Sequence, residues 1–279
     1  MGARSTGPAG PAPVQDLPAG FCRGLSHFFT DIDDTLTADG MIPAASFQAL
    51  WDLASSGIRI VAVTGRPAGW CDHIARMWPV AGVVGENGAF TYAYDRSRKQ
   101  MRRRLSDPGL GDPARREALQ AVARRVLSEV PGTALASDQA FRLSDIAIDF
   151  REDVPPLPPE SLDEICRILR EEGVEFKVSS IHVNFWQGRF DKMTGVRGFL
   201  AEEEGVSFES IAEGALFIGD SPNDEPLFEA FPHSIAVGNL RRFLDRLSSL
   251  PEYITVSDSA AGFCEAAAEI LRKRSTAPG

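Results

Sequence analysis

The sequence predicts an α/β fold in which a Rossmann-like core domain with a parallel sheet carries an inserted α+β cap domain. Three observations lead to this prediction. Short apolar strands alternate with amphipathic helices near the start of the chain, which is the pattern of βαβ units. The same alternation returns near the end of the chain. Between these parts, antiparallel strand pairs and two further helices indicate a different kind of unit.

The first alternating segment begins after Leu25. Its first helix should place Phe47, Leu50 and Trp51 on one face and end at Gly57. We expect strands over residues 27–30, 58–63 and 82–84 and helices over residues 43–56 and 68–78. Since short loops join these elements, the strands should form a parallel sheet.

The middle segment has the pattern of an α+β unit. Asp112 and Pro113 are typical of a helix start, because Asp caps the first turn and Pro fits its first position. We expect strands over residues 89–95, 100–105, 146–150, 174–179 and 182–186 and helices over residues 112–130 and 160–172.

The α/β pattern resumes near Lys192. We expect helices over residues 193–204, 224–230, 240–247 and 260–272 and strands over residues 215–218, 234–237 and 253–256. The patterns divide the chain into a flexible N-terminal tail (1–24), a core domain in two parts (25–88 and 189–275), the inserted cap domain (89–188) and a C-terminal tail (276–279). The N-terminal tail is expected to be flexible because Gly, Ala and Pro dominate its start.

Composition and charge narrow the function. Hydrophobic residues make up 43% and charged residues 24% of the 279 residues, as in ordinary globular proteins. The net charge of −10 argues against a nucleic-acid or anionic-membrane surface. The four cysteines are far apart, which argues against a zinc site and a disulfide scaffold and favours a cytoplasmic protein. No apolar run reaches the roughly 18 residues of a membrane span.

The first chemical motif follows an apolar strand. Asp31, Asp33 and Asp34 lie within four residues, directly after Phe28-Phe29-Thr30. Carboxylates this close repel one another and require a cation or a proton. Oxygen ligands of this kind suit Mg²⁺. A solvated acidic turn is the alternative interpretation.

Three further motifs follow other strands or open a helix. Thr64-Gly65-Arg66 ends a buried strand, and the Thr hydroxyl can donate to a phosphoryl oxygen. Lys192 opens a helix, where the ammonium and the helix N-terminus both favour an anion. Gly219-Asp220-Ser221-Pro222-Asn223-Asp224 ends another strand and supplies two more acids.

These four motifs are expected to meet at one edge of the sheet. In an open parallel sheet, ligands bind beyond the carboxyl ends of the strands. Asp31, Asp33, Asp220 and Asp224 could then surround one metal ion, with Thr64 and Lys192 beside it. This is the set of groups needed for phosphoryl transfer to a carboxylate.

With these motifs in this order, the chain resembles the haloacid dehalogenase superfamily of phosphohydrolases over roughly residues 26–275. The insert resembles the large α/β cap of subfamily IIB, and Glu86-Asn87-Gly88-Ala89 resembles the turn at its entrance. Within this branch, the chain is similar to sucrose-phosphate and mannosyl-3-phosphoglycerate phosphatases. Asp34 departs from the family pattern, in which Gly is usual, and we interpret it as tolerated rather than catalytic.

The resemblance implies a role for each motif. Asp31 would attack phosphorus, and Asp33 would protonate the leaving oxygen and then deprotonate water. Thr64 and Lys192 would hold the phosphoryl oxygens. The implied Mg²⁺ ligands are Asp31, the Asp33 carbonyl and Asp220, with Asp224 as a further or water-mediated ligand.

Substrate binding is expected from a wider group of residues. Gly65, Arg66 and Asn87 should lie beside the phosphoryl group, together with Thr64 and Lys192. In the cap, Arg142 and Asn184 could bind sugar hydroxyls, and a solvated strand face is the equally supported alternative.

The resulting hypothesis is a cytoplasmic, Mg²⁺-dependent phosphatase of a small sugar phosphate. A phosphosugar mutase shares the same motifs and stays open as an alternative. A phospho-receiver signalling module uses similar residues, but the long insert and the late Gly-Asp motif argue against it. The sequence identifies neither the sugar nor the oligomeric state.

Overall fold

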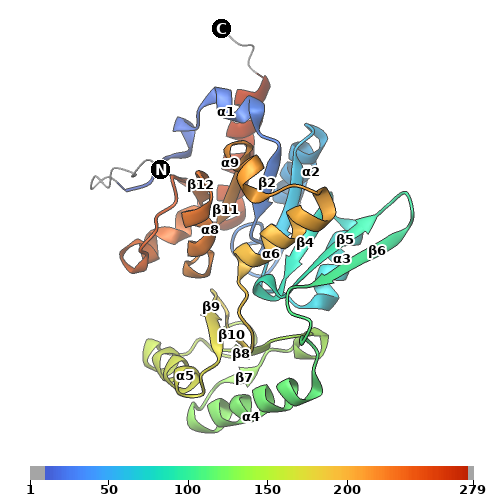
Figure 1. The fold of residues 1–279 in the computed structure, drawn as a ribbon. Helices are drawn as coiled ribbons and strands as arrows, with labels where there is room; N and C mark the ends of the chain where they lie inside the picture. Colours follow the sequence, from blue (N-terminus) through green and yellow to red (C-terminus); the bar gives the residue numbers. More distant parts are fainter. Residues whose placement is uncertain (1–9, 276–279) are drawn as a thin grey trace.

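A computed structural model describes residues 10–275 of the chain. It contains a large core domain and a smaller cap joined to it by two chain segments (Figure 1). No helix within these residues has both the length and the apolar character needed to cross a membrane.

The core is built on a nine-stranded sheet. In spatial order its strands are β1 (Ala12–Pro13), β13 (Tyr253–Ile254), β12 (His233–Ala236), β11 (Ala215–Gly219), β2 (His27–Thr30), β3 (Arg59–Val63), β4 (Gly82–Gly85), β5 (Phe90–Asp95) and β6 (Gln100–Leu105). Neighbours from β1 to β4 are parallel, whereas β5 and β6 are antiparallel additions. The predicted parallel α/β core is therefore confirmed.

Helices cover both faces of this sheet. One face carries α1 (Ala19–Gly24), α2 (Ala44–Ser55), α3 (Ala68–Met77) and α9 (Ser259–Ser275), and the other carries α6 (Lys192–Phe199), α7 (Phe208–Ile211) and α8 (Glu225–Ala230). Successive residues of a strand point to opposite faces. Phe28 of β2 accordingly packs in the first hydrophobic cluster and Phe29 in the second, and both are fully buried. Such burial on both faces explains the continuous apolar runs of these strands.

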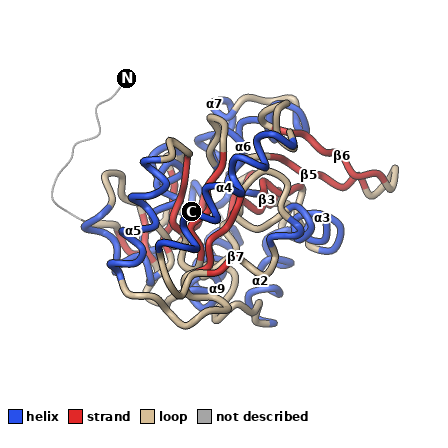
Figure 2. The backbone as a smooth tube through the Cα atoms, turned by 90° about the horizontal axis from the view of Figure 1, so that it is seen from below, coloured by secondary structure: helices blue, strands red, loops and turns tan. Residues whose placement is uncertain are grey.

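The cap has a four-stranded antiparallel sheet and two long helices. Its strands, in spatial order, are β7 (Ala134–Leu135), β8 (Ile146–Asp149), β10 (His182–Trp186) and β9 (Glu175–Val178), and its helices are α4 (Pro113–Glu129) and α5 (Pro159–Glu171). The predicted N-cap of α4 is present, since the carboxylate of Asp112 accepts a hydrogen bond from the Ala114 amide. The cap strands lie toward the core and α4 and α5 lie on the outer side (Figures 1 and 2).

The predicted start of the cap at residue 89 is wrong. β5 pairs with β4, and β6 pairs with β5, so this hairpin extends the core sheet. Phe90 and Tyr92 are buried in the hydrophobic cluster of the core. The unit that stands apart from the core begins only after β6.

The predicted flexible tail is also wrong for residues 10–24. β1 pairs with β13 in parallel, and α1 packs against α9. Val14, Leu17 and Cys22 are buried in the core cluster. The ammonium of Lys273 donates to the carbonyls of Gln15 and Leu17. The rest of that tail, residues 1–9, and the predicted C-terminal tail lie outside the described residues.

A smaller difference concerns the segment predicted as a helix over residues 240–247. It forms a 3₁₀ helix over Gly238–Arg246 that packs Leu240 into the core. The helix predicted over 193–204 continues past α6 as a π-helical turn over Leu200–Glu204.

Candidate active site

The predicted motifs meet at one edge of the core sheet. Asp31 follows β2, Thr64 follows β3 and Asp220 follows β11, and these three strands are parallel neighbours. Lys192 is the first residue of α6, directly after the Asp191 N-cap. Residues far apart in the chain are thus brought together by strand order alone, as the rule for open α/β sheets predicts.

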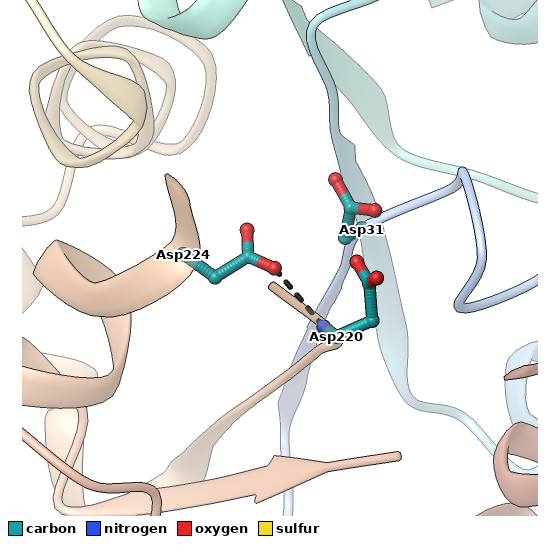
Figure 3. A group of neighbouring side chains, drawn as sticks. All are labelled: Asp31, Asp220 and Asp224. Carbon is teal, nitrogen blue, oxygen red and sulfur yellow. Dashed lines mark hydrogen bonds between the residues drawn. The ribbon is translucent and has the colours of Figure 1, made fainter. Parts of the chain in front are cut away.

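A buried cluster of three carboxylates lies at the centre of this edge. One oxygen each from Asp31, Asp220 and Asp224 lies within 4.8 Å of the others. Figure 3 shows the Asp31 and Asp220 carboxylates adjacent to one another, with Asp224 across from them. All three residues are buried. Three acids in such a space need a positive charge among them.

Lys192 supplies one such charge. Its ammonium donates to Asp31 Oδ1 at 2.6 Å and to Asp224 Oδ1 at 2.7 Å. Burial alone would lower the pKa of Lys192, but the Asp224 and Asp31 carboxylates outweigh it and raise that pKa. The lysine is therefore held as a cation against the oxygens of Asp31.

One lysine does not balance the charge of three carboxylates, so the cluster could also bind a metal ion. Burial raises the pKa of Asp31, and the charges of Asp224 and Asp33 add to this, although Lys192 opposes it. Burial and the charges of Asp31 and Asp224 also raise the pKa of Asp220. A divalent cation with a preference for oxygen ligands would relieve this repulsion, so the residues fit Mg²⁺.

The carboxylate of Asp224 already has other contacts. Its Oδ1 accepts from Lys192, and its Oδ2 accepts from the amide of Asp220 at 3.1 Å and that of Ser221 at 3.4 Å. The amide group of Asn239 donates to Asp220 Oδ2 at 3.1 Å. Asp224 thus holds the turn that presents Asp220, and its role toward a metal ion stays a prediction.

Gly65 lines the cavity that contains Asp31 and Asp220, and Thr64 and Asn87 lie next to Gly65. The Thr64 hydroxyl accepts from the Arg66 amide at 3.0 Å, and the Asn87 amide donates to the Thr64 carbonyl at 3.1 Å. A Cβ on Gly65 would lie 3.3 Å from the Asn87 side chain, so glycine lets the two approach closely. The buried Nδ2 of Asn87 has no hydrogen-bond partner among the described residues. An unpaired buried donor is costly unless a ligand accepts from it.

Arg66 joins the core to the cap. Its Nε donates to both oxygens of Asp33, at 3.0 and 3.1 Å. Its Nη2 donates to Glu152 Oε1 of the cap at 2.7 Å, and its guanidinium stacks on Trp70, 4.4 Å from the ring centre. His182 of the cap lies 2.9 Å from the other oxygen of Glu152. The side chain of Asp33 remains 21% exposed, so it stays reachable from the cavity.

Arg142 is engaged by other protein groups. Its guanidinium donates to Asp138, to Asp145 and to the backbone carbonyl of Gly65, the last at 3.0 Å. Asn184 donates to Asp145 Oδ2 at 2.8 Å. Both residues line the cavity that contains Asp31, but their contacts give them a part in docking the cap on the loop after β3. Substrate binding by either residue stays a prediction.

Glu86 is a second docking point, which the motifs did not indicate. Its buried carboxylate accepts from the Ala68 amide of the core, and from the amides of Leu143 and Ser144 and the Ser144 hydroxyl of the cap. Burial and the charge of Asp145 raise the pKa of Glu86 to about 7. The sequence marks Glu86 only by its place before the predicted Asn-Gly turn.

The chain is similar to known hydrolases in sequence and in fold. Residues 28–108 match the haloacid dehalogenase-like hydrolase family. No curated protein matches the sequence. A solved structure from Thermoplasma acidophilum has a TM-score of 0.66 at 15% identity, over 88% of this chain and 98% of that chain.

Two solved phosphatases share the same fold. One is a haloalkanoate-superfamily phosphatase from Bacteroides thetaiotaomicron, with a TM-score of 0.59 and 19% identity over 91% of this chain and 97% of that chain. The other is the sucrose-phosphatase of Synechocystis, with a TM-score of 0.57 and 19% identity over 89% of this chain and 98% of that chain. The family match thus covers the first part of the core, and the fold of nearly the whole chain is the one that these solved phosphatases share.

Proposed function

We propose that this protein is a Mg²⁺-dependent phosphatase that cleaves a phosphate monoester of a sugar or sugar derivative through an aspartyl phosphate. The observation that carries the proposal is the contact of Lys192 with Asp31 inside the cluster formed with Asp220 and Asp224. A buried carboxylate beside a fixed cation and a metal-sized acidic cluster suits a nucleophile that must approach an anionic phosphate.

In the first step, an oxygen of Asp31 attacks phosphorus. A bond forms between this oxygen and phosphorus, and the bond from phosphorus to the sugar oxygen breaks. Asp33 transfers its proton to the departing sugar oxygen, which leaves as a hydroxyl. Lys192, the Thr64 hydroxyl and the unpaired Nδ2 of Asn87 would hold the phosphoryl oxygens.

In the second step, water attacks phosphorus of the aspartyl phosphate. Asp33, now ionised, takes a proton from this water. The bond between phosphorus and the Asp31 oxygen breaks, which releases inorganic phosphate and restores the Asp31 carboxylate and the protonated Asp33. Asp31, Asp220 and the Asp33 carbonyl would hold Mg²⁺, which supplies charge neutralisation between Asp31 and the phosphate.

The sugar part of the proposal is supported by two features. The Synechocystis neighbour was solved with sucrose and phosphate, and it shares the fold. The cavity around Asp31 also contains hydroxyl, amide and imidazole groups of the cap, from Ser179, Ser180, His182 and Asn184. Such side chains suit a ligand rich in hydroxyl groups. We also propose a cytoplasmic location, a small-molecule substrate and no nucleic-acid partner, in keeping with the acidic charge.

A phosphate-release assay tests the proposal. The protein, incubated with Mg²⁺, should release inorganic phosphate from sugar monophosphates and from p-nitrophenyl phosphate. Excess chelator should abolish release, added Mg²⁺ should restore it, and Ca²⁺ should inhibit, because its looser coordination misplaces Asp31. Full activity in excess chelator would exclude this mechanism.

The same assay addresses the alternatives. A phosphosugar mutase would convert the substrate into an isomer without releasing phosphate in proportion. A phospho-receiver module would accumulate long-lived phosphoaspartate without turnover. Stoichiometric release of phosphate, with no isomerised sugar phosphate, would support the phosphatase over both.

A further inference from the structure

We infer that the leaving group of the substrate occupies a polar chamber between core and cap, and that this chamber selects a neutral polyhydroxyl group over one that carries a second negative charge. The inference rests on the proposed function. The chamber has a volume of about 220 Å³. It is lined by Asp33, Asp34, Thr37, Asp39, Gly40 and Arg66 of the core and by Arg151, Glu152, Ser180 and Ile181 of the cap.

The chamber lies directly beside the cavity in which the reaction is proposed to occur. It shares Asp33, Arg66, Ser180 and Ile181 with the cavity that contains Asp31. A group that protonates the leaving oxygen must lie within hydrogen-bond reach of it. The rest of the leaving group must therefore lie next to Asp33. An apolar cavity also borders Asp33 but shares only this residue with the cavity that contains Asp31, so the polar chamber is the better continuation of that cavity.

The size of the chamber limits the ligand. Pockets for drug-sized ligands usually have volumes of roughly 300–1,000 Å³. The chamber, at about 220 Å³, is smaller than this range. A leaving group of about one sugar ring suits such a space better than a long chain or a nucleotide.

The charges on the wall select the chemistry of that group. Besides the carboxyl group of Asp33, which is protonated in the proposed mechanism, Asp34, Asp39 and Glu152 contribute three carboxylates, whereas Arg66 and Arg151 contribute two guanidinium groups. Arg66 is already in contact with Asp33 and Glu152. The chamber therefore has a net negative charge. Sugar hydroxyls can donate charge-assisted hydrogen bonds to these carboxylates. A second carboxylate or phosphate on the leaving group would instead meet like charge.

Two of the acids are kept at positions that favour glycine. Asp34 and Asp39 have φ angles of 54° and 50°, in the left-handed region. Side chains are disfavoured there, although Asp is among those that tolerate it best. Each position places a carboxylate on the chamber wall where glycine would place none. We therefore interpret these acids as part of the leaving-group site. For Asp34, this role replaces the interpretation as a tolerated departure from the family pattern.

Matched substrate pairs test the inference. Within a pair, the two compounds have the same sugar ring and differ by one carboxylate: glucose 1-phosphate with glucuronic acid 1-phosphate, and galactose 1-phosphate with galacturonic acid 1-phosphate. We expect kcat/KM to be at least about tenfold higher for the neutral member of each hydrolysed pair, because like-charge contacts weaken binding. Glucosamine 6-phosphate, which adds a cation instead, should retain the activity of glucose 6-phosphate or exceed it.

Variants separate the chamber from the rest of the molecule. Asp39→Asn removes one wall charge and should raise the ratio of kcat/KM for the acidic over the neutral member severalfold. Glu117→Gln, an exposed acid on α4 outside the chamber, is the matched control and should leave the ratio unchanged.

The outcomes distinguish this inference from the proposed function. Equal kcat/KM values within the pairs, or a preference for the acidic members, would overturn the chamber while leaving the phosphatase in place. Release of phosphate from p-nitrophenyl phosphate but from none of the sugar phosphates would also overturn it. No release from any compound, in the presence of Mg²⁺, would overturn the proposed function itself.

Discussion

Arg66 lies between Asp33 of the core and Glu152 of the cap, and its guanidinium donates to both carboxylates. The arginine is buried and both carboxylates are partly exposed, so these ion pairs are only partly shielded from solvent. The group proposed as the acid of the reaction is thus oriented by an arginine whose other side is held by the cap. Cap docking and the placement of Asp33 are therefore linked through one side chain.

This link predicts a specific effect of Glu152→Gln. Loss of the charge should leave Arg66 less well held and Asp33 less well placed. A sugar alkoxide needs the proton from Asp33, whereas p-nitrophenolate is a good leaving group and hardly needs it. We expect kcat for a sugar phosphate to fall by about tenfold or more and kcat for p-nitrophenyl phosphate to change much less.

Steady-state kinetics with both substrates measure this split. Glu160→Gln, an exposed acid in the first turn of α5, is a control in the same domain and should leave both rates unchanged. An equal fall of kcat for the two substrates in Glu152→Gln would mean that Glu152 supports only the folding of the cap.

A second prediction concerns the pair Asp224 and Lys192. Asp224→Asn leaves the buried ammonium with Asp31 as its remaining carboxylate partner, and places an amide NH₂ near either this cation or the turn amides. Breaking a buried ion pair typically costs about 3–5 kcal/mol. We expect a loss of that order in the free energy of unfolding, measured with urea.

A double-mutant cycle checks the cause of this loss. In Asp224→Asn combined with Lys192→Met, no buried ammonium is left underpaired, so the double variant should be more stable than the sum of the two single losses predicts. A coupling energy of about 1 kcal/mol or more is expected for groups in direct contact. Additive losses would show that the two residues do not stabilise each other.

A third prediction follows from the docked N-terminal segment. Leu17 is buried against the core, and its carbonyl accepts from Lys273. Leu17→Ala should lower the free energy of unfolding by about 2–5 kcal/mol, as for other large-to-small core substitutions. Gln15→Ala, an exposed change in the same segment, should have little effect. A negligible loss for Leu17→Ala in urea unfolding would mean that the segment does not contribute to the core in solution.

Local patterns predict most of the fold. The strands His27–Thr30, Gln100–Leu105 and His182–Trp186 have the predicted bounds. Apolar residues mark the first and the last, whereas the polar turn before Gln100 marks the second. A hairpin pattern, however, does not reveal which sheet the hairpin joins. The prediction therefore places β5 and β6 in the cap, whereas they extend the core sheet. The ordered structure of the N-terminal segment could not be predicted, because Gly, Ala and Pro surround the three residues that bury it in the core, Val14, Leu17 and Cys22.

The site is predictable where it follows strands and not where it depends on the cap. Asp31, Thr64 and Asp220 each end a strand, and topology brings strand ends together. Glu152 lies in a loop with no repeating pattern, and only the packing of cap on core brings it to Arg66. Asn239, which holds Asp220, likewise comes from a 3₁₀ helix whose position no local pattern reveals.

A fourth prediction uses the docking carboxylate Glu86. Its pKa of about 7 in the folded protein lies above the ordinary value of 4.5. Between these two values the folded state binds more protons than the unfolded state, so stability falls as pH rises through this window and levels off above about 7. Glu86→Gln cannot ionise and lacks this dependence.

Thermal unfolding between pH 5 and 8 measures the effect. In Glu86→Gln, the amide group of the new side chain also meets backbone donors, which adds a cost that does not change with pH. The melting temperature of the variant, relative to the unsubstituted protein, should therefore rise with pH by several degrees. A constant difference across this range would mean that the pKa of Glu86 is not raised.

The last prediction separates the roles of Asp31 and Asp33. In Asp31→Asn the nucleophile is lost, because an amide cannot form the acyl phosphate, and no turnover is expected with any substrate. In Asp33→Asn the proton donor is lost, which typically costs about 10²–10⁴-fold with a poor leaving group. A sugar phosphate should then form the intermediate very slowly, whereas p-nitrophenyl phosphate should still give a burst of nitrophenolate. Steady-state turnover with the latter should fall as well, because hydrolysis of the aspartyl phosphate also uses Asp33. Pre-steady-state nitrophenolate release from the two variants is the decisive measurement, with circular dichroism and Mg²⁺ titration showing that both are folded and bind the metal. Complete loss of the burst in both variants would refute this division of roles, since Asp33 would then be as necessary as Asp31 for the first step.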